Sequence, residues 1–327
     1  MSNEWLDTLV VARREATSRI VVLDLAGPDG TELPEFAPGA HVDVLVDGSG
    51  GLVDGSDGLV RQYSLCGPPH ERTRYRLAVL AETASRGGSL SMHRLREGDR
   101  LRISPPRNRF GVSATARRHL LLAGGIGVTP LLAMAHALEA AGAEYELHYC
   151  ARSRAEAAFL DELEHHPRVR LHFDDGPDAQ RFAVATAIGR PDPDTAIYVC
   201  GPGGFMDFVI SSALAAGWGA DAIHKERFAP TESAEAHKAG GTFTVRLAKS
   251  GGEYEVKEGD SVLDVLLAHG VDAPYSCQQG ICGECIVRVL AGEPDHRDDI
   301  LTDRERADGM FTTCSSRALS PTLELDL

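Results

Sequence analysis

The chain has 327 residues, 43% hydrophobic and 25% charged, a composition typical of a globular protein with two or three domains. Its formal net charge of −15 argues against a nucleic-acid partner, because phosphate backbones attract clustered Lys and Arg. No apolar run approaches the ~18 residues of a membrane span, and the acidic N-terminal segment lacks the apolar stretch of a secretory signal. We therefore expect a cytoplasmic protein with no membrane partner.

Residues 1–112 read as short β-segments separated by glycine and proline turns. Alternating or β-branched runs occupy 18–27, 41–46, 61–67 and 74–82, and a strand begins within 96–104. A glycine-rich stretch at 48–58 predicts a flexible loop. Many short strands with such turns predict a small antiparallel β-barrel.

Residues 113–228 change to an alternation of strands and helices. Buried strands are predicted at 118–125, 145–151, 169–175 and 196–202, and helices at 131–142, 156–166 and 205–217. Strands that alternate with helices predict βαβ units and a parallel sheet.

The remaining chain reads as a linker followed by a small acidic module. Residues 229–240 lack large apolar side chains, as linkers do, whereas 242–259 has a hairpin pattern and 261–270 an amphipathic helix pattern. Residues 241–327 contain 16 acidic and 8 basic residues, a balance of −8. About half the net charge therefore lies in about a quarter of the chain, which favours a separate module.

Four of the seven cysteines gather in this module. Cys277, Cys282 and Cys285 form a C-x4-C-x2-C loop, and Cys314 follows 29 positions later. This is the plant-type ferredoxin spacing, in which four thiolates hold a 2Fe-2S cluster. Small residues such as Gly280 would let backbone amides reach the sulfurs. A four-cysteine zinc site is the alternative, but structural zinc generally uses two short Cys pairs.

Two segments of the N-terminal region suit a phosphorylated ring cofactor. In RQYSL (61–65), Arg61 can bind a phosphate, Tyr63 can lie against a flat ring, and the Ser64 hydroxyl can bond a ring nitrogen. SRGGSLSMHRL (85–95) reads as a glycine turn that opens a helix, which is a suitable anion site. An ordinary strand and turn are the alternative for each segment.

Two glycine-rich turns follow strands of the α/β region. GGIGVTP (124–130) and CGPGGFM (200–206) would lie at the same edge of a parallel sheet, where a pyrophosphate can approach a helix N-terminus. Neither is the G-x-G-x-x-G fingerprint, so a tight packing turn is the alternative for each. Together they favour a dinucleotide cleft.

These motifs, in this order, resemble those of the phthalate dioxygenase reductase family, which includes vanillate O-demethylase reductases. The resemblance spans essentially the whole chain and extends to PPRNRF (105–110), KERF (225–228) and LTDRER (301–306). It implies a flavin-binding β-barrel (1–112), an NAD-binding α/β domain (113–228), a linker (229–240) and a C-terminal β-grasp 2Fe-2S ferredoxin (241–327).

The implied function is that of an oxygenase or demethylase reductase component. It would pass electrons from NADH through FMN and a 2Fe-2S cluster to a terminal oxygenase, a Rieske non-haem iron protein. A flavin is the required intermediary, because a nicotinamide gives up two electrons as hydride whereas an iron–sulfur cluster accepts one. The alternatives are a reductase for a haem monooxygenase and a ferredoxin-fused redox sensing module.

The resemblance also assigns residues. It implies hydride transfer at Ser64, Thr129 and Cys200, with Ser64 facing flavin N5. It implies cluster ligation by Cys277, Cys282, Cys285 and Cys314. The other implied contacts are those of the flavin with Arg61, Gln62, Tyr63 and Phe228, of its phosphate with Gly87, Gly88 and Ser89, of the nicotinamide with Gly125, and of the adenosine ribose with Arg152 and Ser153. Arg152 and Arg154 could instead accept the 2′-phosphate of NADPH.

Acidic residues near the last cysteine predict a docking surface. We expect them to meet a basic patch of the oxygenase and to act mainly on the association rate. The alternative is that they only keep the module soluble. The residues are Asp295, Asp298, Asp299, Asp303 and Glu305.

Overall fold

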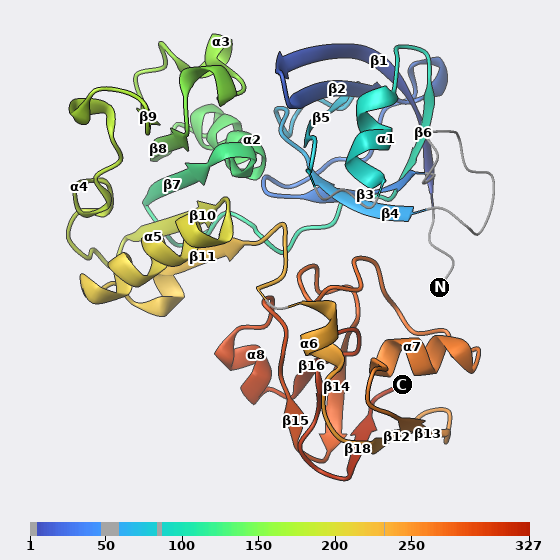
Figure 1. Cartoon of the computed structure of the whole chain (residues 1–327). Coiled ribbons are helices and arrows are strands. Elements are labelled where there is room, and N and C mark those ends of the chain that lie inside the picture. Colours follow the sequence, from blue (N-terminus) through green and yellow to red (C-terminus); the bar gives the residue numbers. More distant parts are fainter. Residues whose placement is uncertain (1–4, 47–58, 84–86, 232) are drawn as a thin grey trace. The chain divides into compact units, whose positions relative to one another are not determined.

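The computed structural model describes residues 5–46, 59–83, 87–231 and 233–327 (Figure 1). The loop predicted at 48–58 lies outside these residues. The described chain forms two compact units, one ending at Glu226 and the other running from Arg227 to Leu327. In the described ranges, no helix combines the length and apolar character needed to cross a membrane.

The first unit begins with an antiparallel sheet of six strands in the order β4-β3-β6-β1-β2-β5. The two edge strands meet at a single bridge between Leu65 and Leu77, so the sheet curls without forming a closed ladder in its described part. The expected antiparallel flavin domain is confirmed, but not a closed barrel. The elements are β1 (Leu6–Thr17), β2 (Ile20–Ala26), β3 (His41–Val46), β4 (Leu59–Ser64), β5 (Tyr75–Leu80), α1 (Gly88–Arg94) and β6 (Arg100–Ile103).

The same unit continues with a parallel sheet in the order β11-β10-β7-β8-β9. The predicted alternation of strands and helices is confirmed. The helix predicted at 156–166 shrinks to four residues, because Phe159 has a φ of 62° and interrupts it. The elements are β7 (Arg118–Gly124), α2 (Val128–Ala140), β8 (Glu144–Ala151), α3 (Leu160–Leu163), β9 (Val169–Phe173), α4 (Val184–Ile188), β10 (Thr195–Cys200), α5 (Gly203–Ala215) and β11 (Ile223–Glu226).

One hydrophobic cluster joins the two sheets of this unit. It contains Ile20 and Val22 of the antiparallel sheet together with Leu121 and Tyr149 of the parallel sheet, all nearly inaccessible to solvent. Burial of apolar surface is the main stabilising term in folding, at roughly 25 cal/mol per Å². The shared core therefore fixes the two sheets against each other as one body.

The second unit is a mixed five-stranded sheet in the order β13-β12-β18-β14-β16, as expected of a β-grasp ferredoxin. β12 runs parallel to β18, and a capping box of Ser261 and Asp264 starts α7. The segment 229–240, which composition marks as a linker, contains α6. The elements are α6 (Ala234–Lys238), β12 (Phe243–Leu247), β13 (Glu253–Val256), α7 (Val262–Ala268), β14 (Ile286–Ala291), β15 (Pro294–Asp295), α8 (Asp303–Ala307), β16 (Met310–Thr312), β17 (Arg317–Ala318) and β18 (Thr322–Leu325).

Candidate redox sites

The four clustered cysteines of the second unit lie together although Cys314 is distant in sequence. The sulfurs of Cys285 and Cys314 are 3.3 Å apart. Cys277 also forms side-chain hydrogen bonds with Cys282 and Cys314. Cys282, Cys285 and Cys314 are buried and Cys277 is half-buried. Such a set of sulfurs suits iron, which is bound by thiolates.

Backbone amides of the cysteine loop point at these sulfurs. The amide of Gln279 donates to Cys277 Sγ (3.3 Å), that of Gly280 to Cys314 Sγ (3.3 Å) and that of Glu284 to Cys282 Sγ (3.5 Å). Gly280 has a φ of 73°, and a Cβ there would lie 2.6 Å from Ser315 Oγ. The loop therefore needs glycine at this position, and its amides are arranged as a cluster's sulfurs require.

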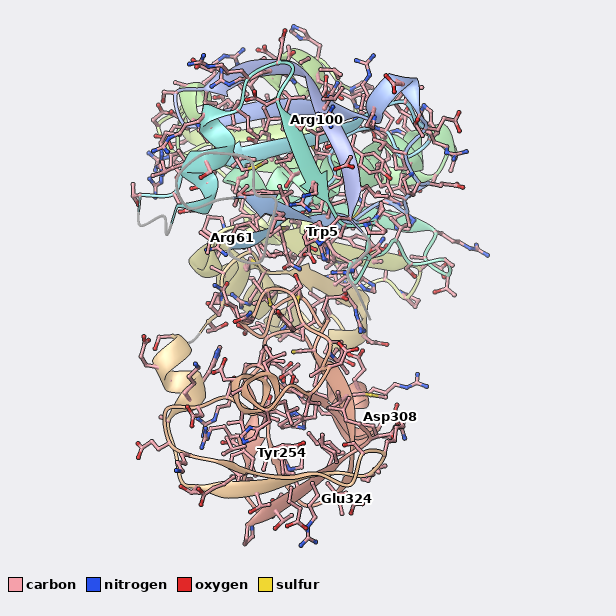
Figure 2. All side chains as sticks on the ribbon, turned by 90° about the vertical axis from the view of Figure 1, so that its right-hand side faces the viewer. Trp5, Arg61, Arg100, Tyr254, Asp308 and Glu324 are labelled. Carbon is pink, nitrogen blue, oxygen red and sulfur yellow. The ribbon has the colours of Figure 1, made fainter. Side chains whose placement is uncertain are left out.

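In the antiparallel sheet, Arg61 of β4 lies against the first turn of α1 (Figure 2 labels Arg61). A Cβ on Gly88 would come 2.7 Å from Cγ and 2.9 Å from Nε of Arg61. Gly87 precedes α1 with a φ of 104°, and Ser89 is buried with its Oγ accepting a bond from the Glu82 amide (3.2 Å). The guanidinium and the glycine turn, distant in sequence, are thus brought together as a phosphate site would require.

Alternation along β4 separates the four residues of RQYS. The side-chain amide of Gln62 donates to Asp43 Oδ1 (3.1 Å) and lies 3.3 Å from His41 Nε2, so it is engaged within the sheet. Tyr63 packs against the hydrophobic core, and burial raises the pKa of its phenol. Gln62 therefore supports the neighbouring strand, whereas Arg61 faces the glycine turn.

Ser64, at the end of β4, meets the end of the parallel sheet. Its hydroxyl donates to Oε2 of Glu226 (3.3 Å), the last residue of β11. Glu226 pairs in register with Cys200 of β10, whose thiol is buried and has its pKa raised by that burial. The Glu226 residue as a whole is partly buried, but its carboxyl group is surrounded by protein. Burial of the carboxyl raises the pKa of Glu226 to about 8.

Glu226 belongs to this site, although its sequence context predicts no role for it. It lies in KERF (225–228), a segment that resembles the family without indicating a function. Only its position at the end of β11, beside Cys200 of β10, could have indicated the role, and the sequence pattern does not predict β11.

The turn after β7 packs directly on the turn after β10. A Cβ on Gly127 would lie 2.3 Å from the carbonyl oxygen of Cys200 and 2.5 Å from the amide nitrogen of Gly201. Thr129 is buried, and its hydroxyl donates to the Ile126 carbonyl (3.0 Å). Thr129, Cys200 and Ser64 thus lie around one junction of the two sheets, at the carboxyl edge where α/β sheets bind nucleotides.

We expect Gly127→Ala to destabilise the first unit by about 2 kcal/mol and to raise the KM for NADH, because the added methyl group forces two backbone turns apart. Gly127 has a φ of −63°, so the effect is steric and not conformational. Gly204→Ala is the control, since a Cβ there meets nothing within 4 Å. Thermal unfolding and steady-state kinetics provide the measurements. Equal stability of the two variants would contradict the assigned contact.

The remaining assigned residues are more dispersed. Gly125 has a φ of 53°, and a Cβ there would meet open space. Arg152 and Ser153 follow β8, the strand next to β7, and Arg152 is exposed. Phe228 is 40% exposed and belongs to the second unit.

Most of the acids expected to form a docking surface have contacts within their own unit. Asp298 is buried, Asp295 is bonded to Arg297 (2.8 Å), and Glu305 accepts bonds from Thr302 in a capping box. Carboxylates engaged in this way contribute less to steering than free ones. The docking prediction therefore rests mainly on exposed acids such as Asp303.

Two family matches agree with this geometry. The family described as "2Fe-2S iron-sulfur cluster binding domain" matches residues 245–319, and "Dimethylamine monooxygenase subunit DmmA-like, N-terminal domain" matches residues 99–223. The chain is 45% identical to a vanillate O-demethylase oxidoreductase of Pseudomonas putida, over 98% of this chain and all of that one. It is 37% identical to the phthalate dioxygenase reductase of Burkholderia cepacia, covering 98% and 97%.

The chain belongs to the phthalate dioxygenase reductase family. A solved phthalate dioxygenase reductase, described as a modular structure for electron transfer from pyridine nucleotides to [2Fe-2S], has 36% identity and a TM-score of 0.69 over 99% of this chain and 98% of that one. An intact type IV self-sufficient cytochrome P-450 monooxygenase has 39% identity and a TM-score of 0.86 over 99% of this chain and 41% of that longer one. As a family member, the chain is an oxidoreductase with flavin, nucleotide and 2Fe-2S domains, the reductase component of an oxygenase system.

Proposed function

We propose that this phthalate dioxygenase reductase relative transfers electrons from NADH, through FMN and a 2Fe-2S cluster, to a Rieske non-haem iron oxygenase. Full-length identity of 45% to a vanillate O-demethylase oxidoreductase is the observation that carries the proposal. The flavin would accept hydride and release single electrons to the cluster. The proposed domains are those expected from the sequence, 1–112, 113–228 and 241–327, with 229–240 between the last two.

The chain's own residues would bind and orient these groups. Arg61 and the Gly87–Ser89 turn would hold the flavin phosphate, Tyr63 and Ser64 the flavin ring, and the Ser64–Glu226 pair would keep the ring edge oriented at the junction of the two sheets. Cys200 would border the nicotinamide as a neutral thiol, because burial raises its pKa. Cys277, Cys282, Cys285 and Cys314 would hold the two irons.

The partner is tested by turnover with purified oxygenases. A vanillate demethylase oxygenase, a phthalate dioxygenase oxygenase and a haem monooxygenase, each with its own substrate, form the panel. We expect NADH-coupled product formation with a Rieske protein. Turnover with the haem monooxygenase and with neither Rieske protein would favour the alternative function, a reductase for a haem monooxygenase. The similarity to a self-sufficient cytochrome P-450 monooxygenase is the observation that supports this alternative. A protein that reduces no acceptor with NADH would instead be a sensing module.

We expect NADH to be preferred over NADPH. Arg154 is ion-paired with Glu164, which leaves only Arg152 of the two arginines for a 2′-phosphate. Asp174 and Asp175 follow β9, and the Asp175 amide bonds the Arg152 carbonyl (3.2 Å), so carboxylates stand close to the same turn. The measurement is kcat/KM for both nucleotides. A tenfold preference for NADPH, about 1.4 kcal/mol, would show that Arg152 reads the phosphate.

We expect the bound flavin to be FMN, because Arg61 and the glycine turn form a compact site suited to a terminal phosphate. Acid extraction followed by mass spectrometry identifies the released flavin. Recovery of FAD would overturn this assignment without affecting the cluster.

A further inference from the structure

The segment that follows Glu226 is fastened to the second unit. The Arg297 guanidinium donates hydrogen bonds to three backbone carbonyls of this segment. Lys238, in the same segment, forms an ion pair with Asp264, with Nζ 2.6 Å from Oδ2. The three acceptors are Ala236 (2.9 Å), His237 (3.3 Å) and Ala239 (2.5 Å). Residues 233–239 therefore belong structurally to the ferredoxin unit.

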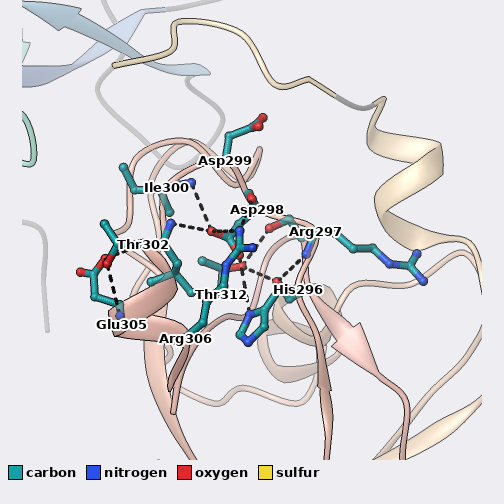
Figure 3. Close-up of polar contacts among 12 residues, drawn as sticks. His296, Arg297, Asp298, Asp299, Ile300, Thr302, Glu305, Arg306 and Thr312 are labelled. Atoms are coloured by element: carbon teal, nitrogen blue, oxygen red, sulfur yellow. Dashed lines mark hydrogen bonds and ion pairs between the residues drawn. The ribbon is translucent and has the colours of Figure 1, made fainter. Parts of the chain in front are cut away.

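Asp299 fastens the beginning of the same segment. Its carboxylate accepts bonds from the Thr231 amide (2.7 Å) and hydroxyl (2.5 Å), and it lies 3.9 Å from Nε of Arg227. The Arg227 side chain is only 11% exposed. Figure 3 shows the Asp299 side chain pointing away from the contacts that surround Asp298. Asp299 is thus available to the connecting segment.

The backbone of Asp299 contacts the cysteine loop. Its amide donates to the Gly280 carbonyl (3.0 Å), and the Gly280 amide donates to Cys314 Sγ (3.3 Å). The neighbouring Asp298 carboxylate is buried and accepts bonds from the amides of Ile300 (3.1 Å) and Leu301 (2.7 Å), which fixes this turn (Figure 3). One residue therefore joins the connecting segment to the loop that carries the cluster ligands.

The first contact of the connecting segment with the second unit directly follows the last strand of the first unit. Glu226 ends β11 and bonds Ser64 in the first unit, and Arg227 begins the second. If Arg227–Thr231 were released, the tether would gain five residues, up to about 17 Å of extended chain. A longer tether lowers the effective concentration of one module at the other, and electron transfer between centres slows steeply with their separation.

We propose that Asp299 is a positioning residue for electron transfer between flavin and cluster: it clamps Arg227–Thr231 to the ferredoxin unit and so keeps the tether short. The inference rests on the proposed function, because it requires both cofactors. Asp299 contributes through the chain it holds and not through contact with a reacting group.

Asp299→Ala is tested in the full-length protein with both cofactors bound, against Glu258→Ala. The control removes the same charge from an exposed position of the same unit. Stopped-flow mixing with NADH separates flavin bleaching from cluster reduction. We expect Asp299→Ala to slow cluster reduction by about fivefold or more while bleaching stays unchanged. Trypsin should cleave after Arg227 about tenfold faster than in the control, because the clamp no longer restrains this site.

The outcomes separate the clamp from the function. If both variants match the parent in cluster reduction and in cleavage after Arg227, the clamp is refuted. If the parent shows no bleaching by NADH, the proposed function fails, while the cleavage result still decides the clamp. If Asp299→Ala loses its cluster spectrum, Thr231→Val replaces it, since this change removes the hydroxyl donor and leaves the cysteine loop intact. Unaltered cleavage in Thr231→Val would then overturn the proposal.

Discussion

The Cys282→Ala variant is expected to purify with its flavin bound and with almost no iron. Cys282 is buried and its sulfur accepts a bond from the Glu284 amide, so alanine removes both a thiolate and the acceptor of that amide. Plant-type 2Fe-2S clusters are held by four cysteine sulfurs, and loss of one leaves an iron incompletely coordinated. The flavin residues belong to the other unit and should be unaffected.

Three measurements check this expectation. Iron analysis should fall from two atoms per chain to near zero, the visible absorbance of the cluster should disappear, and NADH–ferricyanide activity, which needs only the flavin, should persist. Cys150→Ala is the control, because Cys150 is half-buried in the first unit. Zinc in the parent protein, or full iron content in Cys282→Ala, would contradict the assignment.

The Glu226→Gln variant is expected to be more stable than the parent in alkaline solution but not in acid. Burial raises the pKa of Glu226 from its ordinary 4.5 to about 8. Below pH 4.5 the carboxyl is protonated in both folded and unfolded states. Between these values only the unfolded chain ionises, so the parent loses stability as pH rises towards 8. At about 1.4 kcal/mol per pKa unit, the upper limit of this loss is about 5 kcal/mol.

Glutamine cannot ionise, so Glu226→Gln should lack this decline. Unfolding curves followed by flavin fluorescence at pH 5, 7 and 9 measure the difference, which should grow with pH. Glu156→Gln is the control, since Glu156 is exposed in the same unit. Parallel pH profiles of the parent and Glu226→Gln would show that the carboxyl is not desolvated.

The cysteine loop and the βαβ alternation were predictable because their signals are local. The spacing of Cys277, Cys282 and Cys285 places three sulfurs in one loop whatever the rest of the chain does, and the match to the 2Fe-2S cluster binding domain family agrees with it. Hydrophobic strands separated by amphipathic helices likewise specify a parallel sheet from short-range pattern alone.

The junction of the two sheets was not predictable in this way. Glu226 lies in IHKE, a four-residue strand without hydrophobic alternation, and becomes important only through its register with Cys200 and its bond to Ser64. The contact between Arg61 and Gly88 also depends on tertiary structure. Residues 229–240 read as a linker because their composition is polar, but Arg297 binds their backbone carbonyls, which composition does not reveal.

The pairing of β12 with β18 has a consequence for how the ferredoxin unit is made. β12 is the first strand of its sheet in sequence order, and β18 is the last. In the sheet, however, β18 lies between β12 and β14 and runs parallel to β12. During synthesis the chain emerges from its N-terminus, so all four cysteines leave the ribosome before the central strand does. β12 and β14 each pair with β18, so this part of the sheet cannot form until β18 has been synthesised. Contacts between strands so distant in sequence also form slowly. The cysteines therefore pass through a period in which they are available to iron, to zinc or to oxidants before the sheet encloses them.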